Sequence, residues 1–228
     1  MKLKEYRKKR NFGSTPESRG ASDVQEKGND SLIYVVQKHI ASHLHYDFRL
    51  EWRGVLLSWA VPKGPSLDPA VKRLAMQTED HPIEYSEFEG VIPAGEYGAG
   101  IVMLWDQGAW QPETADVDKS LQNGEIKFAL QGKKLKGLWV LIRTRGFGKN
   151  PTRSAWLLIK HRDHYASTDD VTQKEPRSIT SQRLLTDIAK DDGGNIERAG
   201  LGDPPSKGQR ETSSKLASGR VSRKRQPS

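Results

Sequence analysis

The segment 37–51, QKHIASHLHYDFRLE, carries the side chains of this 228-residue chain that are best suited to chemistry. On an extended strand, residues two apart point the same way, so His45 and Asp47 present an imidazole and a carboxylate side by side. This pair suits a divalent cation that accepts mixed nitrogen and oxygen ligands, such as Mn²⁺, Fe²⁺ or Zn²⁺. Arg49 continues the same face, and its guanidinium suits a phosphate bound next to such a cation.

His39 has the same parity as His45, but a straight strand would hold the two residues about 20 Å apart, at ~3.3 Å per residue. His39 therefore reaches the same site only if the chain turns between Ile40 and Leu44, and the stretch Ala-Ser-His between them permits a turn. Taken alone, a His-x-Asp pattern is more typical of a polar strand face whose histidines meet solvent.

Short apolar runs separated by glycine-containing turns predict the elements that position these residues. In HYDFRLEW, Tyr46, Phe48 and Leu50 alternate with the polar face. The other runs are SLIYVVQ, VLLSWAVP, VKRLAMQT, GIVMLWD, EIKFAL, LWVLIRT and SAWLLIK. Many short strands, with no helix of three or more turns between residues 32 and 165, favour an all-β barrel or sandwich. Its core would contain five tryptophans: Trp59, Trp105, Trp110, Trp139 and Trp156.

Composition divides the chain into three zones. Residues 1–31 form a basic N-terminal arm with a short helix expected near residues 3–9. Residues 32–165 hold nearly all the apolar and aromatic side chains and are expected to fold as one compact β-barrel domain. Residues 166–228 are polar and basic, and we expect them to be a largely disordered tail, with one amphipathic stretch at 181–190 that could form a helix on the body.

Composition also excludes several classes of protein. The chain has no cysteine, which rules out disulfides and thiolate metal sites and suits a reducing compartment. No apolar run approaches the roughly 18 residues that span a bilayer, so no membrane association is expected. Residues 1–31 carry 8 basic and 5 acidic side chains, and residues 171–228 carry 12 and 7. These basic ends would attract phosphate backbones without sequence specificity, or simply confer solubility.

Long strings in the chain resemble the 3′-phosphoesterase domain of bacterial DNA ligase D, over about residues 3–160. They are EYRKKRNFGSTPE, the continuous segment from QKHIASH to GEYGAG, and WDQGAW. The resemblance implies a compact β-barrel with short flanking helices. It also implies a metal-dependent enzyme that removes a 3′-terminal ribonucleoside, and then the 3′-phosphate, from primer ends during non-homologous end joining. Mn²⁺ would be the preferred metal, with Co²⁺ or Zn²⁺ as other options.

Transferred residue by residue, the resemblance implies roles for thirteen side chains. The metal ligands would be His39, His45 and Asp47. His81 would act as general acid or donate to the transferring phosphoryl group. The other catalytic positions would be Arg49, Lys63, Arg73, Tyr85 and Glu79, and the supporting positions Gln37, Arg10, Asn11 and Glu17. Judged without the family, Lys63 is a turn lysine, Arg73 an exposed strand residue, and the stretch GEYGAG a β turn.

Two positions depart from the family's pattern. Asn11 follows Arg10 where aspartate is usual, and His43 stands where arginine is common. If that aspartate assists phosphate removal, this chain would perform one of the two steps better than the other.

Two other functions remain open at this point. The chain could be a DNA-end-binding module with reduced or no catalysis, although the intact set of His39, His45, Asp47 and His81 argues against it. It could also be a phosphoesterase for a cyclic or small nucleotide. The expected partners are the 3′ ends of DNA or DNA/RNA primer-templates and, by analogy with fused proteins, a separately encoded ligase, polymerase or end-binding protein. We expect a stand-alone monomer in the bacterial cytoplasm, associated with the nucleoid.

Overall fold

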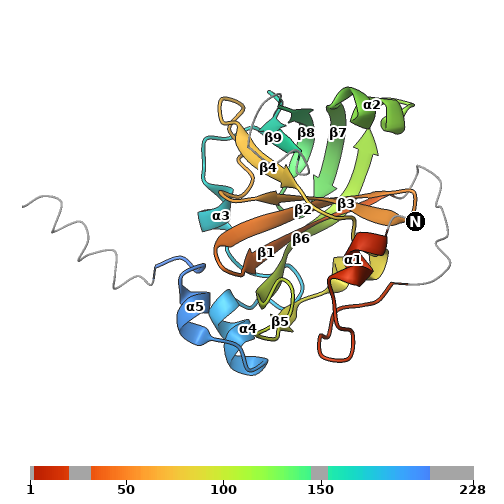
Figure 1. Cartoon of the computed structure of the whole chain (residues 1–228). Helices are drawn as coiled ribbons and strands as arrows, with labels where there is room; N and C mark the ends of the chain where they lie inside the picture. Colours follow the sequence, from red (N-terminus) through yellow and green to blue (C-terminus); the bar gives the residue numbers. More distant parts are fainter. Residues whose placement is uncertain (1–2, 21–31, 145–153, 206–228) are drawn as a thin grey trace, which may run out of the picture.

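Nine β-strands and a few short helices make up the structure, a computed structural model that describes residues 3–20, 32–144 and 154–205 (Figure 1). The strands are β1 (Ile33–Ile40), β2 (Leu44–Trp52), β3 (Val55–Val61), β4 (Arg73–Gln77), β5 (Gly90–Ile92), β6 (Gly100–Pro112), β7 (Glu125–Gly132), β8 (Lys136–Arg143) and β9 (Ala155–Lys160). The helices are α1 (Lys4–Lys8), α2 (Val117–Asn123), α3 (Val171–Lys174), α4 (Leu185–Asp191), α5 (Ile196–Gly200) and a 3₁₀ turn, η2 (Ile83–Glu87).

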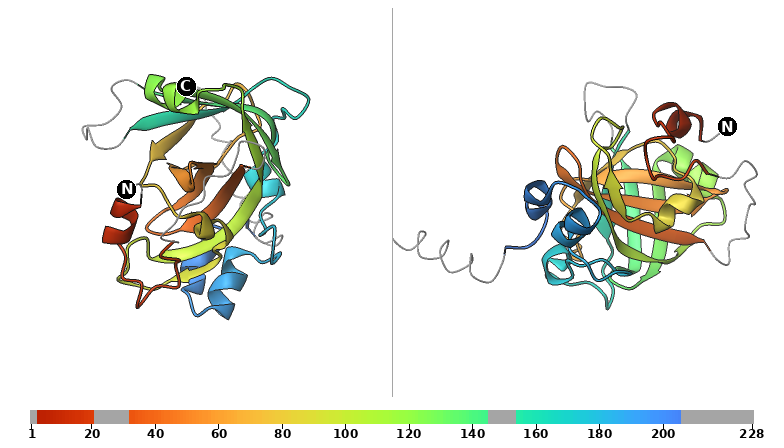
Figure 2. Two further views of the ribbon diagram at one scale, coloured as in Figure 1. Left: turned by 90° about the vertical axis from the view of Figure 1, so that its right-hand side faces the viewer. Right: turned by 90° about the horizontal axis from the view of Figure 1, so that it is seen from below.

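The sheet closes into a barrel. Its strand order is β1-β2-β3-β4-β9-β8-β7-β6-β5, and β1 also pairs with β6, so eight strands form an antiparallel ring while β5 is added to the side of β6. Closure leaves these eight strands without a free edge, and Figure 2 shows the barrel from two further sides. The expected mainly-β barrel with short flanking helices is confirmed, and all eight runs expected to be strands are strands.

Alternation along the strands separates the core from the site. Tyr46, Phe48 and Leu50 of β2 point into the barrel and belong to its main apolar cluster, which also contains the five tryptophans expected there. The intervening Asp47 and Arg49 are on the outer face of β2 and are buried as well. The outer face is therefore covered, and η2 provides part of the cover through a second apolar cluster that consists of Val35, Leu56, Tyr85 and Leu104.

A tight hairpin joins β1 to β2. Ile40 pairs with Leu44, so the chain reverses over the three residues between them and His39 lies directly opposite His45. The turn on which a shared site for the two histidines depended is confirmed.

The packed body extends to residue 205, so the expected tail boundary at residue 165 is wrong for residues 166–205. Leu185, Ile188 and Ala189 of α4 are buried in the main apolar cluster, and Ala199 of α5 joins them. Asp203 stabilises the start of α4 by accepting hydrogen bonds from the backbone N–H groups of Leu185 and Thr186. A helical stripe of few apolar residues was enough to bind this polar segment to the barrel, although its overall composition favoured disorder.

The ends of the chain are described only in part. The short N-terminal helix is confirmed as α1. The rest of the arm, residues 21–31, and the basic segment 206–228 lie outside the described residues, so the disorder expected of the tail is not tested there. Within the described ranges, no helix is long and apolar enough to cross a membrane.

The burial of α4 predicts that Ile188 contributes to stability. We expect Ile188→Ala, at a fully buried position, to lower the free energy of unfolding by about 2–5 kcal/mol because it leaves a cavity under the helix. Ile196→Ala on α5 is the matched control, since Ile196 is 51% exposed and its truncation should cost less than about 0.5 kcal/mol. Urea unfolding of both variants measures the difference. Equal, small losses would show that α4 does not pack as described.

Candidate metal centre and phosphate site

The β1–β2 hairpin brings three possible metal ligands together. His39 Nδ1 lies 3.6 Å from Asp47 Oδ2, and His45 Nε2 lies 3.7 Å from Asp47 Oδ1. The two imidazole rings are 4.7 Å apart, and one ligand atom from each of the three residues falls within 4.8 Å of the others. Strand pairing produces this cluster, because His39 is opposite His45 and Asp47 is two residues further along β2.

Two backbone carbonyls fix which nitrogen each histidine presents. His39 Nε2–H donates to the carbonyl of Gly98 (2.9 Å), and His45 Nδ1–H donates to the carbonyl of His43 (3.0 Å). The other nitrogen of each ring, Nδ1 of His39 and Nε2 of His45, therefore faces the Asp47 carboxylate. Hydrogen bonds of this kind to the second ring nitrogen orient metal-bound histidines in general.

These residues fit a divalent cation. Two imidazole nitrogens and a carboxylate converge within 4.8 Å of one another, which is the donor set and spacing that a bound divalent cation requires. Two nitrogens and one oxygen suit Mn²⁺, Co²⁺ or Zn²⁺, and three protein ligands leave a position open for water or a substrate oxygen.

Arg49 ties this cluster to the rest of the site. Its Nη2 contacts Asp47 Oδ2 at 3.1 Å, and both side chains are buried. Burial alone would raise the pKa of the Asp47 carboxyl, but Arg49 and the neighbouring imidazoles hold that pKa well below its usual range. Asp47 is therefore ionised and ready to bind a metal at neutral pH.

His81 lies on the other side of Arg49, between two guanidinium groups. Its Nδ1 is 2.8 Å from Arg49 Nη1 and 2.9 Å from the carbonyl of Glu79, and its Nε2 is 3.2 Å from Arg10 Nη2. The tautomer with a proton on Nδ1 satisfies both the Glu79 carbonyl and the Arg10 donor, while Arg49 Nη1 donates to Ser58 Oγ (2.8 Å). Burial, Arg49 and Arg10 all lower the pKa of His81, so the ring is neutral at neutral pH.

Gln37 and Tyr85 contact Arg49 and hold it in place. Gln37 Oε1 accepts from Arg49 Nε (2.9 Å), while its amide donates to the carbonyls of Tyr85 and Phe88. Tyr85 is 2% exposed and packs against His81 and the Arg49 guanidinium. Gln37 therefore acts on the metal cluster through Arg49, and Tyr85 forms a buried wall behind His81.

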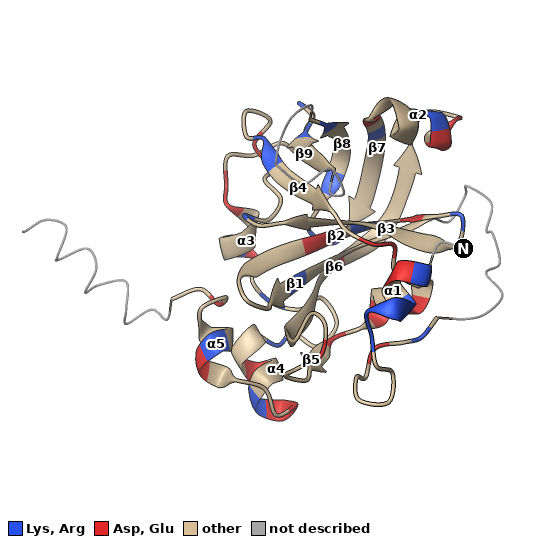
Figure 3. Ribbon diagram, viewed as in Figure 1, with Lys and Arg blue, Asp and Glu red and all other residues tan. Residues whose placement is uncertain are grey.

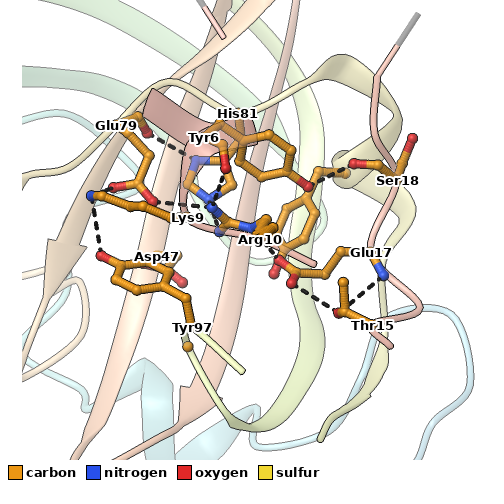
Figure 4. Close-up of polar contacts among 12 residues, drawn as sticks. Tyr6, Lys9, Arg10, Thr15, Glu17, Ser18, Asp47, Glu79, His81 and Tyr97 are labelled. Atoms are coloured by element: carbon orange, nitrogen blue, oxygen red, sulfur yellow. Dashed lines mark hydrogen bonds and ion pairs between the residues drawn. The ribbon is translucent and has the colours of Figure 1, made fainter. Parts of the chain in front are cut away.

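The N-terminal arm completes the site from a distant part of the sequence (Figure 4). Arg10 stacks 3.8 Å from the centre of the Tyr6 ring and forms ion pairs with Glu17 (2.8 Å) and Glu79 (3.2 Å). Lys9 also pairs with Glu79, at 3.0 Å. Acidic and basic residues lie next to each other on α1 (Figure 3), so the arm is held by specific pairs rather than by a field of one sign.

Three of the expected site residues are not drawn into these contacts. Among the described residues, Lys63 is exposed and makes no ion pair or hydrogen bond with the metal cluster, and Asn11 uses its side chain to accept from the backbone of Gly13. Arg73 lies on β4 with a buried Nε that has no hydrogen-bond partner in the described structure. The roles expected of Lys63, Arg73 and Asn11 therefore stay predictions.

Sequence reasoning missed Lys9, Ser58 and Tyr97. Ser58 follows from register, because it pairs with Arg49 across β2 and β3. Lys9 and Tyr97 had no such signal, since Lys9 Nζ and Tyr97 Oη meet at 3.4 Å only after residues far apart in the chain are folded together.

The geometry predicts that divalent cations stabilise the folded chain. At a Mn²⁺ concentration about 100-fold above Kd, binding adds about 2.7 kcal/mol and should raise Tm by roughly 5–10 °C. His45→Ala should abolish the shift. His43→Ala is the matched control on the same hairpin, because only the backbone carbonyl of His43 contacts His45. Thermal unfolding with and without Mn²⁺, Co²⁺ or Zn²⁺ tests this, and a full shift in His45→Ala would exclude the proposed ligand.

The buried, neutral His81 predicts a pH-dependent stability. Its pKa in the folded state lies below the unfolded value of about 6.5, so as pH falls below ~6.5 the unfolded chain takes up a proton that the folded chain does not. Stability therefore falls with pH in this window. We expect His81→Gln to remove about 1–2 kcal/mol of the loss between pH 7 and pH 5, whereas His164→Gln, at an exposed histidine, should not. Urea unfolding at both pH values measures this, and a loss that His81→Gln leaves unchanged would contradict the described environment.

Comparisons with known proteins identify the family to which the barrel belongs. Residues 37–143 match the family described as the DNA Ligase D 3′-phosphoesterase domain. The multifunctional non-homologous end joining protein LigD of Pseudomonas aeruginosa is 54% identical over 186 residues, which cover 80% of this chain and 22% of that protein. LigD of Mycolicibacterium smegmatis is 44% identical over 167 residues, 71% of this chain and 21% of that protein. The LigD repair protein of Mycobacterium tuberculosis strain H37Rv is 47% identical over 146 residues, 64% and 19% of the two chains.

The chain thus spans about a fifth of the length of these relatives. The matched segment contains the three candidate metal ligands, Arg49 and His81, and it begins at Gln37. By sequence, residues 37–143 of this chain belong to the DNA ligase D 3′-phosphoesterase domain family.

Proposed function

We propose that this chain is a divalent-metal-dependent hydrolase of nucleic acid 3′ ends. It would remove a 3′-terminal ribonucleoside, and then the 3′-phosphate, from DNA or DNA/RNA primer-templates during non-homologous end joining. One observation carries the proposal: Arg49 joins a three-ligand cation cluster to a buried histidine through direct contacts on both sides. A metal, a guanidinium and an imidazole side by side suit the binding and hydrolysis of a phosphate ester. The curated relatives are named for non-homologous end joining, which supports the setting.

The metal would be held by His39, His45 and Asp47, and when bound it would polarise a phosphoryl oxygen or lower the pKa of a water molecule. The chain's own residues would position the phosphate. Arg49 and Arg10 place two guanidinium groups around His81, an arrangement that stabilises negative charge in a partly dry site. Because Glu17 and Glu79 form ion pairs with Arg10, the positive charge of Arg10 is compensated before an anion binds.

His81 would donate a hydrogen bond to the phosphate or protonate the leaving oxygen. The free protein holds this ring neutral, so a general-acid role requires that the anion raise its pKa on binding. A phosphate near Nε2 would also compete with the ring for Arg10 Nη2. The phosphate would therefore take over a guanidinium donor and supply the negative charge that favours a protonated ring.

Other parts of the proposal rest on the resemblance alone. Lys63 and Arg73 would bind the phosphate, and the unpartnered Nε of Arg73 is consistent with a ligand that completes its hydrogen bonding. Asn11 would shift the balance between the two steps. Mn²⁺ as the metal, a monomeric state, a location in the bacterial cytoplasm or nucleoid, and a separate ligase, polymerase or end-binding partner are also proposed by analogy.

The decisive experiment is Mn²⁺-dependent release of a terminal ribonucleoside from a 5′-labelled primer-template. We expect the wild-type chain to yield a 3′-phosphate end and then a 3′-hydroxyl end. His45→Ala and His81→Ala should each lower the rate by about 10²-fold or more, because they remove a metal ligand and a phosphate-facing donor. His43→Ala should retain the wild-type rate.

Three outcomes would contradict the proposal in different ways. Binding to primer-template without release of either product would favour a DNA-end-binding module. Equal activity on a small or cyclic nucleotide, with no need for a recessed 3′ end, would favour a different substrate. Equal activity in His43→Ala and His45→Ala would remove the metal cluster from the reaction.

A further inference from the structure

The loop at residues 93–100, which joins β5 to β6, lies against the metal cluster. Two successive turns shape it, with Glu96 N–H donating to the Pro93 carbonyl (3.2 Å) and Ala99 N–H donating to the Glu96 carbonyl (3.1 Å). Gly98 has φ +81°, a conformation that favours glycine, and its carbonyl accepts the hydrogen bond from His39 Nε2. Tyr97 directly precedes Gly98 in the sequence. The loop is therefore fixed directly to a candidate metal ligand.

The N-terminal arm holds the same loop from the other side. Ser14 Oγ donates to Glu96 Oε1, and Lys9 Nζ lies 4.8 Å from the centre of the Tyr97 ring while pairing with Glu79. The Arg10 guanidinium lies 5.4 Å from the same ring centre. Figure 4 shows the Tyr97 ring in the group that contains Lys9, Arg10 and His81. Tyr97 is thus held at the border between the metal cluster and the phosphate-facing residues.

Tyr97 is nevertheless 40% exposed. Few large apolar side chains of the described residues are as exposed, and the others are Tyr165, Ile196 and Leu201, which do not belong to this loop. An aromatic ring that belongs to an anchored loop and lies beside two cations, but is open to solvent, resembles the platforms on which unpaired bases stack. The nearby cations suit the phosphates on either side of such a base.

We propose that Tyr97 is a stacking platform for the nucleobase of the 3′-terminal nucleotide. Stacked on this ring, the last nucleoside would be held with its phosphodiester facing His39, His45, Asp47 and Arg49. Such a contact binds any base, because every base offers a π-face, so it would position the end of a strand without reading its sequence. This inference rests on the proposed action on 3′ ends.

The test compares substrates that differ only in the terminal base. Primer-templates ending in a 3′-ribonucleotide and in a 3′-abasic ribose are assayed with the wild-type chain and with Tyr97→Ala. We expect Tyr97→Ala to raise KM for the base-containing end about 5- to 100-fold, the range for loss of one base stack, and to change kcat less than about 2-fold. The abasic end should show the same KM with both proteins.

Further variants separate stacking from a structural role. Tyr97→Trp and Tyr97→Phe should restore the low KM, because they keep an aromatic face, whereas Tyr97→Leu keeps apolar bulk and should not. Tyr165→Ala is the matched control: Tyr165 is 41% exposed and lies against Gly137 at the start of β8. Equal Tm values for the wild type, Tyr97→Ala and Tyr97→Leu would show that the arm and loop remain folded.

A binding measurement without divalent metal gives a readout that needs no catalysis. A primer whose terminal base is 2-aminopurine should lose fluorescence on binding the wild-type chain, and this quenching should disappear in Tyr97→Ala but persist in Tyr165→Ala. If the wild type processes 3′ ends while Tyr97→Ala keeps wild-type KM and quenching, the platform is wrong and the proposed function stands. If the wild type processes no 3′ end, the proposed function fails, and the quenching alone decides whether Tyr97 stacks on the base.

Discussion

A single buried guanidinium joins the two halves of this site. Arg49 contacts the Asp47 carboxylate, the His81 ring, the Ser58 hydroxyl and the Gln37 amide oxygen, and it is 2% exposed. A charge in such a position is tolerated only when its donors are satisfied, because desolvation costs several kcal/mol for each ion. Each partner of Arg49 therefore limits where the other partners can lie, because all of them contact the same guanidinium. In the proposed function, a phosphate that approaches His81 would meet a guanidinium whose position is already fixed by the candidate metal ligand Asp47.

The closed barrel allows the fold to hold these buried polar side chains on its outer face. Closure of eight strands satisfies backbone hydrogen bonding around the ring, so the outer face of β1, β2 and β3 can carry polar groups beneath η2 and the arm. The buried charge of Arg10 is compensated by two ion pairs, one with Glu17 of the arm itself and one with Glu79, which follows β4. The main apolar cluster fills the barrel and continues under α4 and α5, away from these polar contacts. The apolar core and the candidate site thus lie on opposite faces of the same strands.

Much of this could be predicted wherever the relevant signal is local. The alternation in HYDFRLEW placed Asp47 and Arg49 on the face opposite Phe48. The stretch Ala-Ser-His permitted the turn that brings His39 opposite His45, but only the family resemblance led us to expect it. Contacts over long sequence separations were not accessible in the same way. The position of Arg10 against His81 depends on how the arm crosses the barrel. The amphipathic stretch at 181–190 indicated a helix, seen as α4, but not the part of the barrel against which that helix packs. Local periodicity shows which face of a strand or helix is apolar, but it does not show which distant element packs against that face.

In the proposed reaction, the environment of His81 gives the arm a chemical role in addition to its packing, because Arg10 of the arm contacts the ring. In the free protein its Nε2 accepts from Arg10, and its Nδ1–H is directed to the Glu79 carbonyl, so neither nitrogen is idle. A phosphate that takes over the Arg10 donor frees Nε2 and at the same moment supplies the negative charge that favours its protonation. The acid would then be generated by the substrate itself. A ring protonated in advance would have to face two guanidinium groups with no anion between them, which the buried site disfavours.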